Sequence, residues 1–214
     1  MTLTTLLSLL NLPLLFDPEW HVKAITEGGF IPLLFSAKPF ASSYRFVTAT
    51  VLHGGFFHLA GNCLFLVVFG RALERLFGAK PLLLLFPALG IPGFLLQWAM
   101  YSDSSEPVVG ASGAIAALMG AYLPLFPGAR IRMILFLGFF WKRFTVPAWV
   151  LLPYWMGLQL VSIALGGGSK DGVAYGVHVG SFAAGAIAAI VWRTSGLSAE
   201  EKLASFTRKS FEKA

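Results

Sequence analysis

The sequence FHLAGNCLFLVVFGRALERLF, at Phe57–Phe77, is the clearest indication of the fold class. Its middle is an unbroken apolar run, and its three charged side chains lie toward the C-terminal end. A helix rises about 1.5 Å per residue, so about 20 apolar residues cross the roughly 30 Å hydrocarbon core of a bilayer. The segment is therefore predicted to span a membrane.

Other apolar runs, bounded by charged residues, Gly and Pro, have the same character. They are Leu82–Tyr101, Ser112–Phe126, Val146–Leu165 and Val173–Arg193. At about 21 Å, Leu3–Phe16 would be a short or incomplete first span, and whether it crosses stays open. We expect an all-α, polytopic membrane helix bundle of six spans. Residues 1–193 would form the transmembrane domain and residues 194–214 a cytoplasmic C-terminal tail.

The composition indicates that lipid is the main solvent. Hydrophobic residues make up 57% of the 214 residues, charged residues make up 12%, and the mean hydropathy is +0.75. Soluble domains carry about 25% charged residues, so no separate soluble domain is expected. The net charge of +6 does not indicate nucleic-acid binding, because no basic stripe interleaves with aromatic residues. A lone cysteine, Cys63, excludes an intramolecular disulfide and a thiolate metal cluster.

The distribution of positive charge predicts the orientation. Twelve of the 16 Lys and Arg residues fall on one side of the predicted spans and four on the other. Because basic loops face the cytoplasm, we expect the C-terminus there. Residues 1–16 lack the features of a cleavable signal peptide. A compact chain without a targeting extension suits the inner membrane of a prokaryotic cell.

Four polar side chains are expected to meet at one depth in the bilayer. Ser112 begins a short span, and His178 lies five residues into the last one. His58 and Asn62 share a helix face near the start of the first long run. Counting along the helices places these groups about 8 Å below the outer surface. Polar groups in lipid are costly, so their convergence indicates a functional site.

The residue types at this level favour nucleophilic catalysis. A neutral His can take the proton of a Ser hydroxyl, which turns the serine into a nucleophile. The motif Gly110-Ala111-Ser112-Gly113 places Ser112 at a helix N-terminus, where free N–H groups can bind an oxyanion. Asn62 and His58 would add donors. The other polar side chains in the spans are interpreted as packing contacts: Gln97, Gln159 and Ser162.

Small residues at four-residue spacing predict that two of the spans pack closely. In the short span they are Ser112, Ala116 and Gly120. In the last span they are Gly176, Gly180 and Ala184, followed by a second pair, Ser181 and Gly185. Such stripes let two helix backbones approach, as a hydrogen bond between Ser112 and His178 requires.

From about Tyr44 to Arg193, the sequence resembles the rhomboid family of intramembrane serine proteases. Its motifs in this chain are His53-Gly-Gly-Phe-Phe-His58-Leu-Ala-Gly-Asn62, Gly110-Ala-Ser112-Gly113, Gly176-Val-His178-Val-Gly180, Tyr44-Arg45 and Glu74-Arg75. The resemblance implies that Ser112 is the nucleophile and His178 the general base. It also implies that His58, Asn62 and the Ser112 backbone N–H form the oxyanion hole. The substrate would be a transmembrane protein segment in the lipid bilayer, and no cofactor or metal would be needed.

Three residues differ from the pattern that the family usually shows. Ala116 replaces an aromatic residue that packs on the catalytic His, and Val177 and Ser181 replace smaller neighbours of that His. One alternative is a catalytically silent rhomboid-like scaffold that binds membrane clients, although such relatives commonly lack Ser or His. A small transporter or channel would need polar residues across the whole bilayer. Substrate identity, cleavage site, pathway and oligomeric state stay open.

Overall fold

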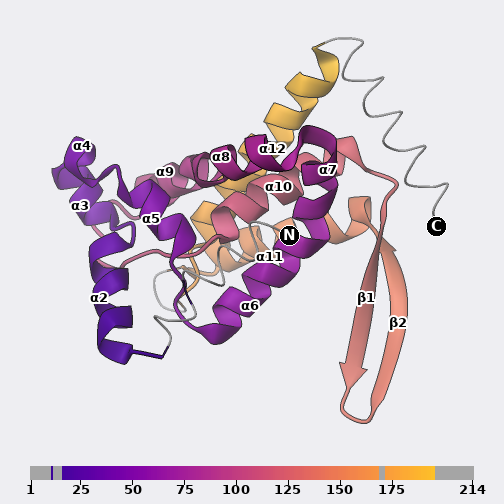
Figure 1. Cartoon of the computed structure of the whole chain (residues 1–214), viewed down its shortest axis with the longest axis horizontal. Helices are drawn as coiled ribbons and strands as arrows, with labels where there is room; N and C mark the ends of the chain where they lie inside the picture. The colour runs from indigo at the N-terminus through magenta and orange to yellow at the C-terminus, as the bar shows by residue number, and fades with distance from the viewer. Residues whose placement is uncertain (1–10, 12–15, 169–171, 196–214) are drawn as a thin grey trace.

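The computed structural model describes Asn11, residues 16–168 and residues 172–195, and this part of the chain is mostly helical (Figure 1). In chain order its elements are α2 (Pro18–Gly28), α3 (Pro32–Ala37), α4 (Pro39–Ser42), α5 (Arg45–Val51), α6 (Phe56–Phe65), the π-helical turn η1 (Leu66–Gly70), α7 (Arg71–Phe77), α8 (Ala79–Leu89), α9 (Ile91–Met100), α10 (Ser112–Leu125), β1 (Arg130–Leu137), β2 (Phe140–Pro147), α11 (Ala148–Ala164) and α12 (Tyr175–Thr194).

Within the described residues, three helices are long and apolar enough to cross a membrane. They are Phe56–Phe77, which joins α6, η1 and α7, Ala79–Met100, which joins α8 and α9, and Tyr175–Thr194, which is α12. The apolar helices α10 and α11 are shorter. The expected short first span lies outside the described residues except for Asn11 and Phe16, and most of the C-terminal tail also lies outside them.

The all-α prediction is wrong for the segment between α10 and α11. Strands β1 and β2 form an antiparallel hairpin in which Arg130 pairs with Pro147 and Leu137 pairs with Phe140. Gly138 takes a φ of 66° in the two-residue turn, where a side chain would be strained. The segment is rich in aromatic and β-branched residues, which suits a strand, and basic and apolar residues alternate over Arg130–Met133. The span expected from Val146 therefore begins at Ala148, after the hairpin ends.

Helix α10 forms the centre of the bundle and is buried along most of its length. A Cβ atom on Gly120 would collide with the Phe182 carbonyl of α12, and one on Gly185 would collide with the Ala117 carbonyl of α10. The close contact predicted from the small-residue stripes is thus confirmed. In lipid such packing replaces the hydrophobic effect as the main attraction between helices.

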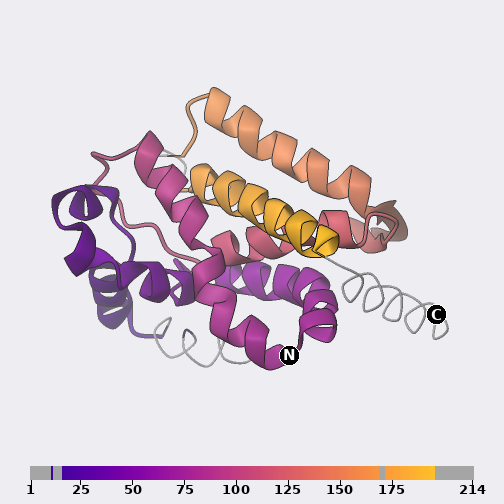
Figure 2. The ribbon, with the colours of Figure 1, turned by 90° about the horizontal axis from the view of Figure 1, so that it is seen from above.

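The short helices α2 to α5 close one end of the bundle through an aromatic cluster. Phe30 is fully buried, and its ring centroid lies 5.1 Å from those of both Phe46 and Phe94. Arg45 donates hydrogen bonds to the carbonyls of Thr26 (3.1 Å) and Gly29 (2.6 Å). Figure 2 shows these helices together at the indigo end, away from the end of the bundle from which the hairpin projects in Figure 1. They support the loop that leads into α10.

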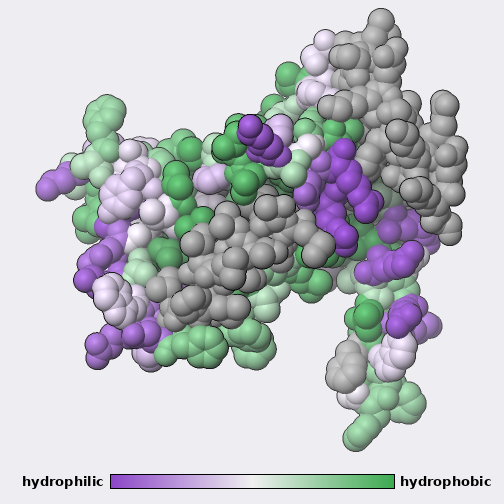
Figure 3. All heavy atoms as spheres, in the orientation of Figure 1, coloured by the Kyte–Doolittle hydropathy of each residue, from purple (hydrophilic) through white to green (hydrophobic). Residues whose placement is uncertain are grey.

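The surface hydropathy follows this layout. On the face drawn in Figure 3, hydrophilic residues gather over α2 to α4 and around α7, and hydrophobic residues cover the tip of the hairpin. Many large apolar side chains on the long helices are exposed, among them Leu64 and Ile187. An integral membrane protein presents such side chains to lipid.

Candidate active site

Ser112 is the first residue of α10, and the preceding loop is fixed on both sides. Phe30 and Val108 form an isolated β-bridge, and the Gly110 N–H donates to the Ala49 carbonyl at 2.8 Å. Gly110 has a φ of 130°, in the region that favours glycine. A Cβ atom there would also lie 2.7 Å from His58 Nε2. Glycine at this position lets the loop pass close to His58 and present Ser112.

Ser112 and His178 meet between α10 and α12. The Ser112 Oγ lies 2.9 Å from His178 Nε2, within hydrogen-bond distance. His178 lies in the first turns of α12, one residue after the buried Val177. A Cβ atom on Gly113 would be only 2.6 Å from Val177 Cγ1. The missing side chain of Gly113 therefore accommodates the bulk of Val177, and the two helices approach closely.

Gln159 of α11 completes this hydrogen-bond chain. Its Oε1 lies 2.8 Å from His178 Nδ1, and its Nε2 donates to the Trp155 carbonyl at 3.4 Å. Since a carboxamide oxygen only accepts, His178 Nδ1 carries the proton and donates it. In a neutral imidazole the other nitrogen is then the acceptor. His178 Nε2 is therefore free to accept the Ser112 hydroxyl proton, as a general base must.

Sequence reasoning missed Gln159, which was interpreted as a packing contact. The signal was a buried amide in an apolar helix, because such a group needs a hydrogen-bond partner. Trp155 was missed as well. Its ring centroid lies 5.6 Å from that of His178, and the ring centroid of Tyr175 lies 6.5 Å from that of His178. These rings from α11 and α12 supply the aromatic contact that Ala116 does not provide.

His58 and Asn62 of α6 lie beside Gly110. The Gly54 N–H donates to His58 Nδ1 at 3.2 Å, so in neutral His58 the proton lies on Nε2, the atom closest to Gly110. The buried Asn62 Nδ2 has no hydrogen-bond partner among the described residues, and a Cβ atom on Gly110 would lie 3.6 Å from it. A buried donor without a partner is costly. Both side chains therefore offer N–H groups near Ser112.

His53 supports His58 from the loop before α6. The two rings make an edge contact with centroids 5.2 Å apart, and His53 Nδ1 lies 3.1 Å from the Val51 carbonyl. Burial, and then the charge of His58, lower the pKa of His53 to about 4, although the bond to Val51 opposes the shift. His53 is thus neutral at physiological pH. It adds no positive charge beside the site.

A cavity of about 610 Å³ lies over these residues. Its walls include His58, Ser112 and His178, together with Gly110 and Val177. Residues of α2 and of the segments that precede α10 and α12 contribute to the lining, among them Ile25, Glu106 and Gly172. The cavity lies where α6, α10 and α12 begin, so the predicted site residues converge at one end of the bundle. Its volume lies within the range of ligand-binding pockets.

The chain matches a family model over most of its length. Residues 41–195 align with the model described as Rhomboid domain. The chain belongs to the rhomboid family. It is an integral membrane protein, and the match runs from α4 to the end of α12, so it includes every residue of the predicted site.

Several curated rhomboid proteins resemble parts of this chain. Rhomboid protease GluP of Bacillus subtilis (strain 168) is 44% identical over 80 residues, which cover 37% of this chain and 15% of GluP. RHOMBOID-like protein 5 of Arabidopsis thaliana is 38% identical over 80 residues, covering 37% of this chain and 26% of that relative. Rhomboid-related protein 2 of Mus musculus is 30% identical over 134 residues, covering 55% of this chain and 44% of the mouse protein. The chain thus spans less than half the length of each of these relatives.

In the part of the chain that the structure describes, no three His, Cys, Asp or Glu side chains are grouped so that they could hold a metal ion.

Proposed function

We propose that this rhomboid protein is an intramembrane serine endopeptidase that hydrolyses peptide bonds in or near transmembrane segments. The observation that carries the proposal is the 2.9 Å contact between Ser112 Oγ and His178 Nε2, with Gln159 fixing the tautomer. Nucleophile, base and orienting group stand in the order that acyl transfer requires. Rhomboid relatives that are named proteases support the same reaction class.

The first half of the reaction forms an acyl-enzyme. Ser112 Oγ attacks the scissile carbonyl carbon while its proton passes to His178 Nε2. The positive charge that forms on His178 is stabilised by the Gln159 oxygen, which accepts the Nδ1 proton. The tetrahedral intermediate then collapses, the C–N bond breaks, and His178 gives its proton to the leaving amine. The N-terminal part of the substrate stays bound to Ser112 as an ester.

The second half releases the product by hydrolysis. A water molecule gives a proton to His178 Nε2 and adds to the ester carbonyl, and the returning proton makes Ser112 the leaving group. The cavity over Ser112 would admit both the substrate and this water. No redox step occurs, and water is the only co-reactant that the hydrolysis consumes.

The oxyanion would be held by three donors. They are the Ser112 backbone N–H at the start of α10, the Nε2–H of His58 and the amide of Asn62. Helix N-termini offer free N–H groups and a favourable dipole to a negative oxygen. The unpartnered Asn62 amide supports this role, since an oxyanion would satisfy it during the reaction.

The substrate would be a transmembrane helix that unwinds locally to reach the cavity. Regular helix hides its carbonyls in internal hydrogen bonds, so an extended stretch is needed for attack by Ser112. A six-span bundle, with the site near the outer face and the C-terminus in the cytoplasm, agrees with the positive-inside pattern. A prokaryotic inner membrane remains the proposed location.

The competing function is a silent rhomboid scaffold that only binds membrane clients. The two functions are separated by purifying the chain in detergent and reconstituting it with a model transmembrane substrate. A protease releases two fragments and reacts with a fluorophosphonate serine probe, whereas a scaffold retains the intact substrate and stays unlabelled.

Asn62→Ala should slow cleavage without weakening substrate binding. Loss of one oxyanion donor costs about 10²–10³ in kcat, because the donor acts mainly in the transition state. KM for the model substrate should stay within about twofold. Leu64→Ala changes an exposed side chain of the same helix and serves as the matched control. A normal kcat for Asn62→Ala would remove Asn62 from the oxyanion hole.

Gln159→Leu should lower kcat by about tenfold or more, because His178 would lose the acceptor that fixes its tautomer and ring orientation. KM should change little, since Gln159 does not line the cavity. Gln159→Glu keeps an acceptor at Nδ1 and should recover most of the lost kcat. If the Leu and Glu variants are equally slow, the amide acts through packing and not through His178.

A further inference from the structure

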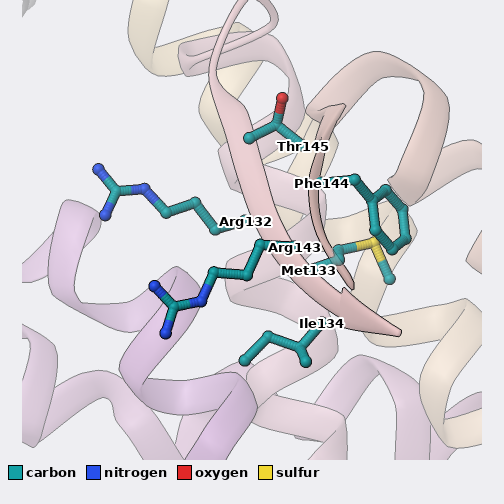
Figure 4. Close-up of a pocket in the computed structure, with 6 residues that line it drawn as sticks. All are labelled: Arg132, Met133, Ile134, Arg143, Phe144 and Thr145. Atoms are coloured by element: carbon teal, nitrogen blue, oxygen red, sulfur yellow. The ribbon is translucent and has the colours of Figure 1, made fainter. Parts of the chain in front are cut away.

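The β1–β2 hairpin carries basic and apolar residues in a fixed register. Arg132 pairs with Thr145 and Ile134 with Arg143, so these side chains share one face of the ribbon. Figure 4 shows Arg132 and Arg143 extended side by side on this face, with Met133 and Phe144 on the other. A hollow of about 380 Å³ is lined by Arg132, Met133, Ile134, Arg143, Phe144 and Thr145.

The hairpin is rich in positive charge and lies in a stretch of sequence without carboxylates. Its cations are Arg130, Arg132, Lys142 and Arg143, and the sequence has no Asp or Glu between Glu106 and Asp171. Arg132 and Arg143 are exposed. The Arg143 guanidinium lies 4.8 Å from the centre of the Trp141 ring. The face is therefore complementary to an anion.

The tip of the hairpin is strongly apolar and open. Phe139 is 101% exposed, Phe140 79% and Trp141 58%. A single side chain of this kind in water is common, but a contiguous patch marks an interaction site. Aromatic residues next to Arg and Lys are also typical of the membrane interface.

The hairpin projects from the end of the bundle that lies opposite Ser112. It joins the C-terminal end of α10 to the N-terminal end of α11, opposite the end that holds Ser112. In Figure 1 it projects sideways from the bundle, across the direction of α8, α9 and α10. If those helices cross the membrane, the ribbon extends along its surface. Its tip then reaches lipid that lies beyond the helices.

We propose that the β1–β2 hairpin is a membrane-surface arm that binds anionic phospholipid. Arg132 and Arg143 hold the headgroup phosphate in the hollow that they help to line. Phe139, Phe140 and Trp141 enter the interface between headgroups and acyl chains. Charge complementarity favours anionic phospholipid over a second copy of the hairpin, because two positively charged hairpins would repel each other. The arm would fix the tilt of α10 and α11 relative to the bilayer.

The proposal is tested by binding of short-chain dioctanoyl phosphatidylglycerol to the full chain in neutral detergent, with dioctanoyl phosphatidylcholine as the uncharged comparison. Each Lys or Arg near an anionic surface contributes on the order of a fivefold change in affinity. The double variant R132Q/R143Q should therefore bind phosphatidylglycerol about 30-fold more weakly and phosphatidylcholine unchanged. The control R75Q/K80Q removes equal charge from exposed sites at the same end of the bundle. It should bind like the wild type.

A second measurement places the tip. A nitroxide attached to Phe139→Cys in a Cys63→Ala background, reconstituted in phosphatidylglycerol vesicles, should be more accessible to oxygen than to a water-soluble nickel chelate. Equal losses in R132Q/R143Q and R75Q/K80Q would overturn the proposal, as would a water-exposed nitroxide. Self-association of the protein that depends on Phe139 and Phe140 would also overturn the proposal, because the partner of the hairpin would then be a second copy of the chain and not lipid. These readouts do not depend on cleavage, so they stand apart from the proposed protease function.

Discussion

Ser112→Ala should abolish cleavage of a transmembrane substrate, with a loss of at least about 10³ in rate. The alanine methyl cannot attack a carbonyl, and His178 then has no proton to accept at Nε2. Labelling by the fluorophosphonate probe should disappear with it, because the probe reacts only with an activated serine. The measurement is fragment release in proteoliposomes, followed in parallel with gel detection of the label.

His178→Ala should cause a loss of the same order, since Ser112 would keep its proton. The two residues act as one unit, so the double variant should be no slower than either single variant. Ser162→Ala is the matched control: it removes a hydroxyl from α11 outside the contact with His178. Persistent labelling after Ser112→Ala, or full cleavage by His178→Ala, would contradict the proposed dyad.

Gly120→Ala should be strongly damaging, although Gly120 lies outside the site residues. The added Cβ atom would collide with the carbonyl oxygen, the carbonyl carbon and the Cα atom of Phe182, which belong to the α12 backbone. A backbone cannot rotate away as a side chain can, so α10 and α12 must separate. Overpacking costs about 1–3 kcal/mol, and here it would also pull His178 away from Ser112. We expect a lower Tm in detergent and a loss of about 10² or more in cleavage rate.

The same substitution elsewhere separates packing from helix propensity. Gly157→Ala adds the identical methyl group to α11, where nothing lies within 4 Å of the new Cβ atom. Its Tm and cleavage rate should be unchanged or slightly raised, because Ala favours helix over Gly. If Gly120→Ala behaves like Gly157→Ala, the close approach of α10 and α12 does not control the site.

The sequence was enough to predict the elements that lipid constrains. Apolar runs such as Phe57–Phe77 must form helices in a bilayer, because their backbone groups find no other partner there. Ser112, His178, His58 and Asn62 stood out for the same reason, since each polar group in an apolar run calls for an explanation. Their spacing along predicted helices led to the prediction that they lie at one level.

Only the tertiary structure decided how these groups are oriented. The tautomer of His178 depends on Gln159, which comes from another helix 19 residues away in sequence. The accommodation of Val177 depends on the absent side chain of Gly113. The β1–β2 hairpin, in which Arg130 pairs with Pro147, was not predicted from the sequence. Helical spans follow from local composition and the solvent, whereas hydrogen bonds and close packing between elements depend on which surfaces the fold brings together.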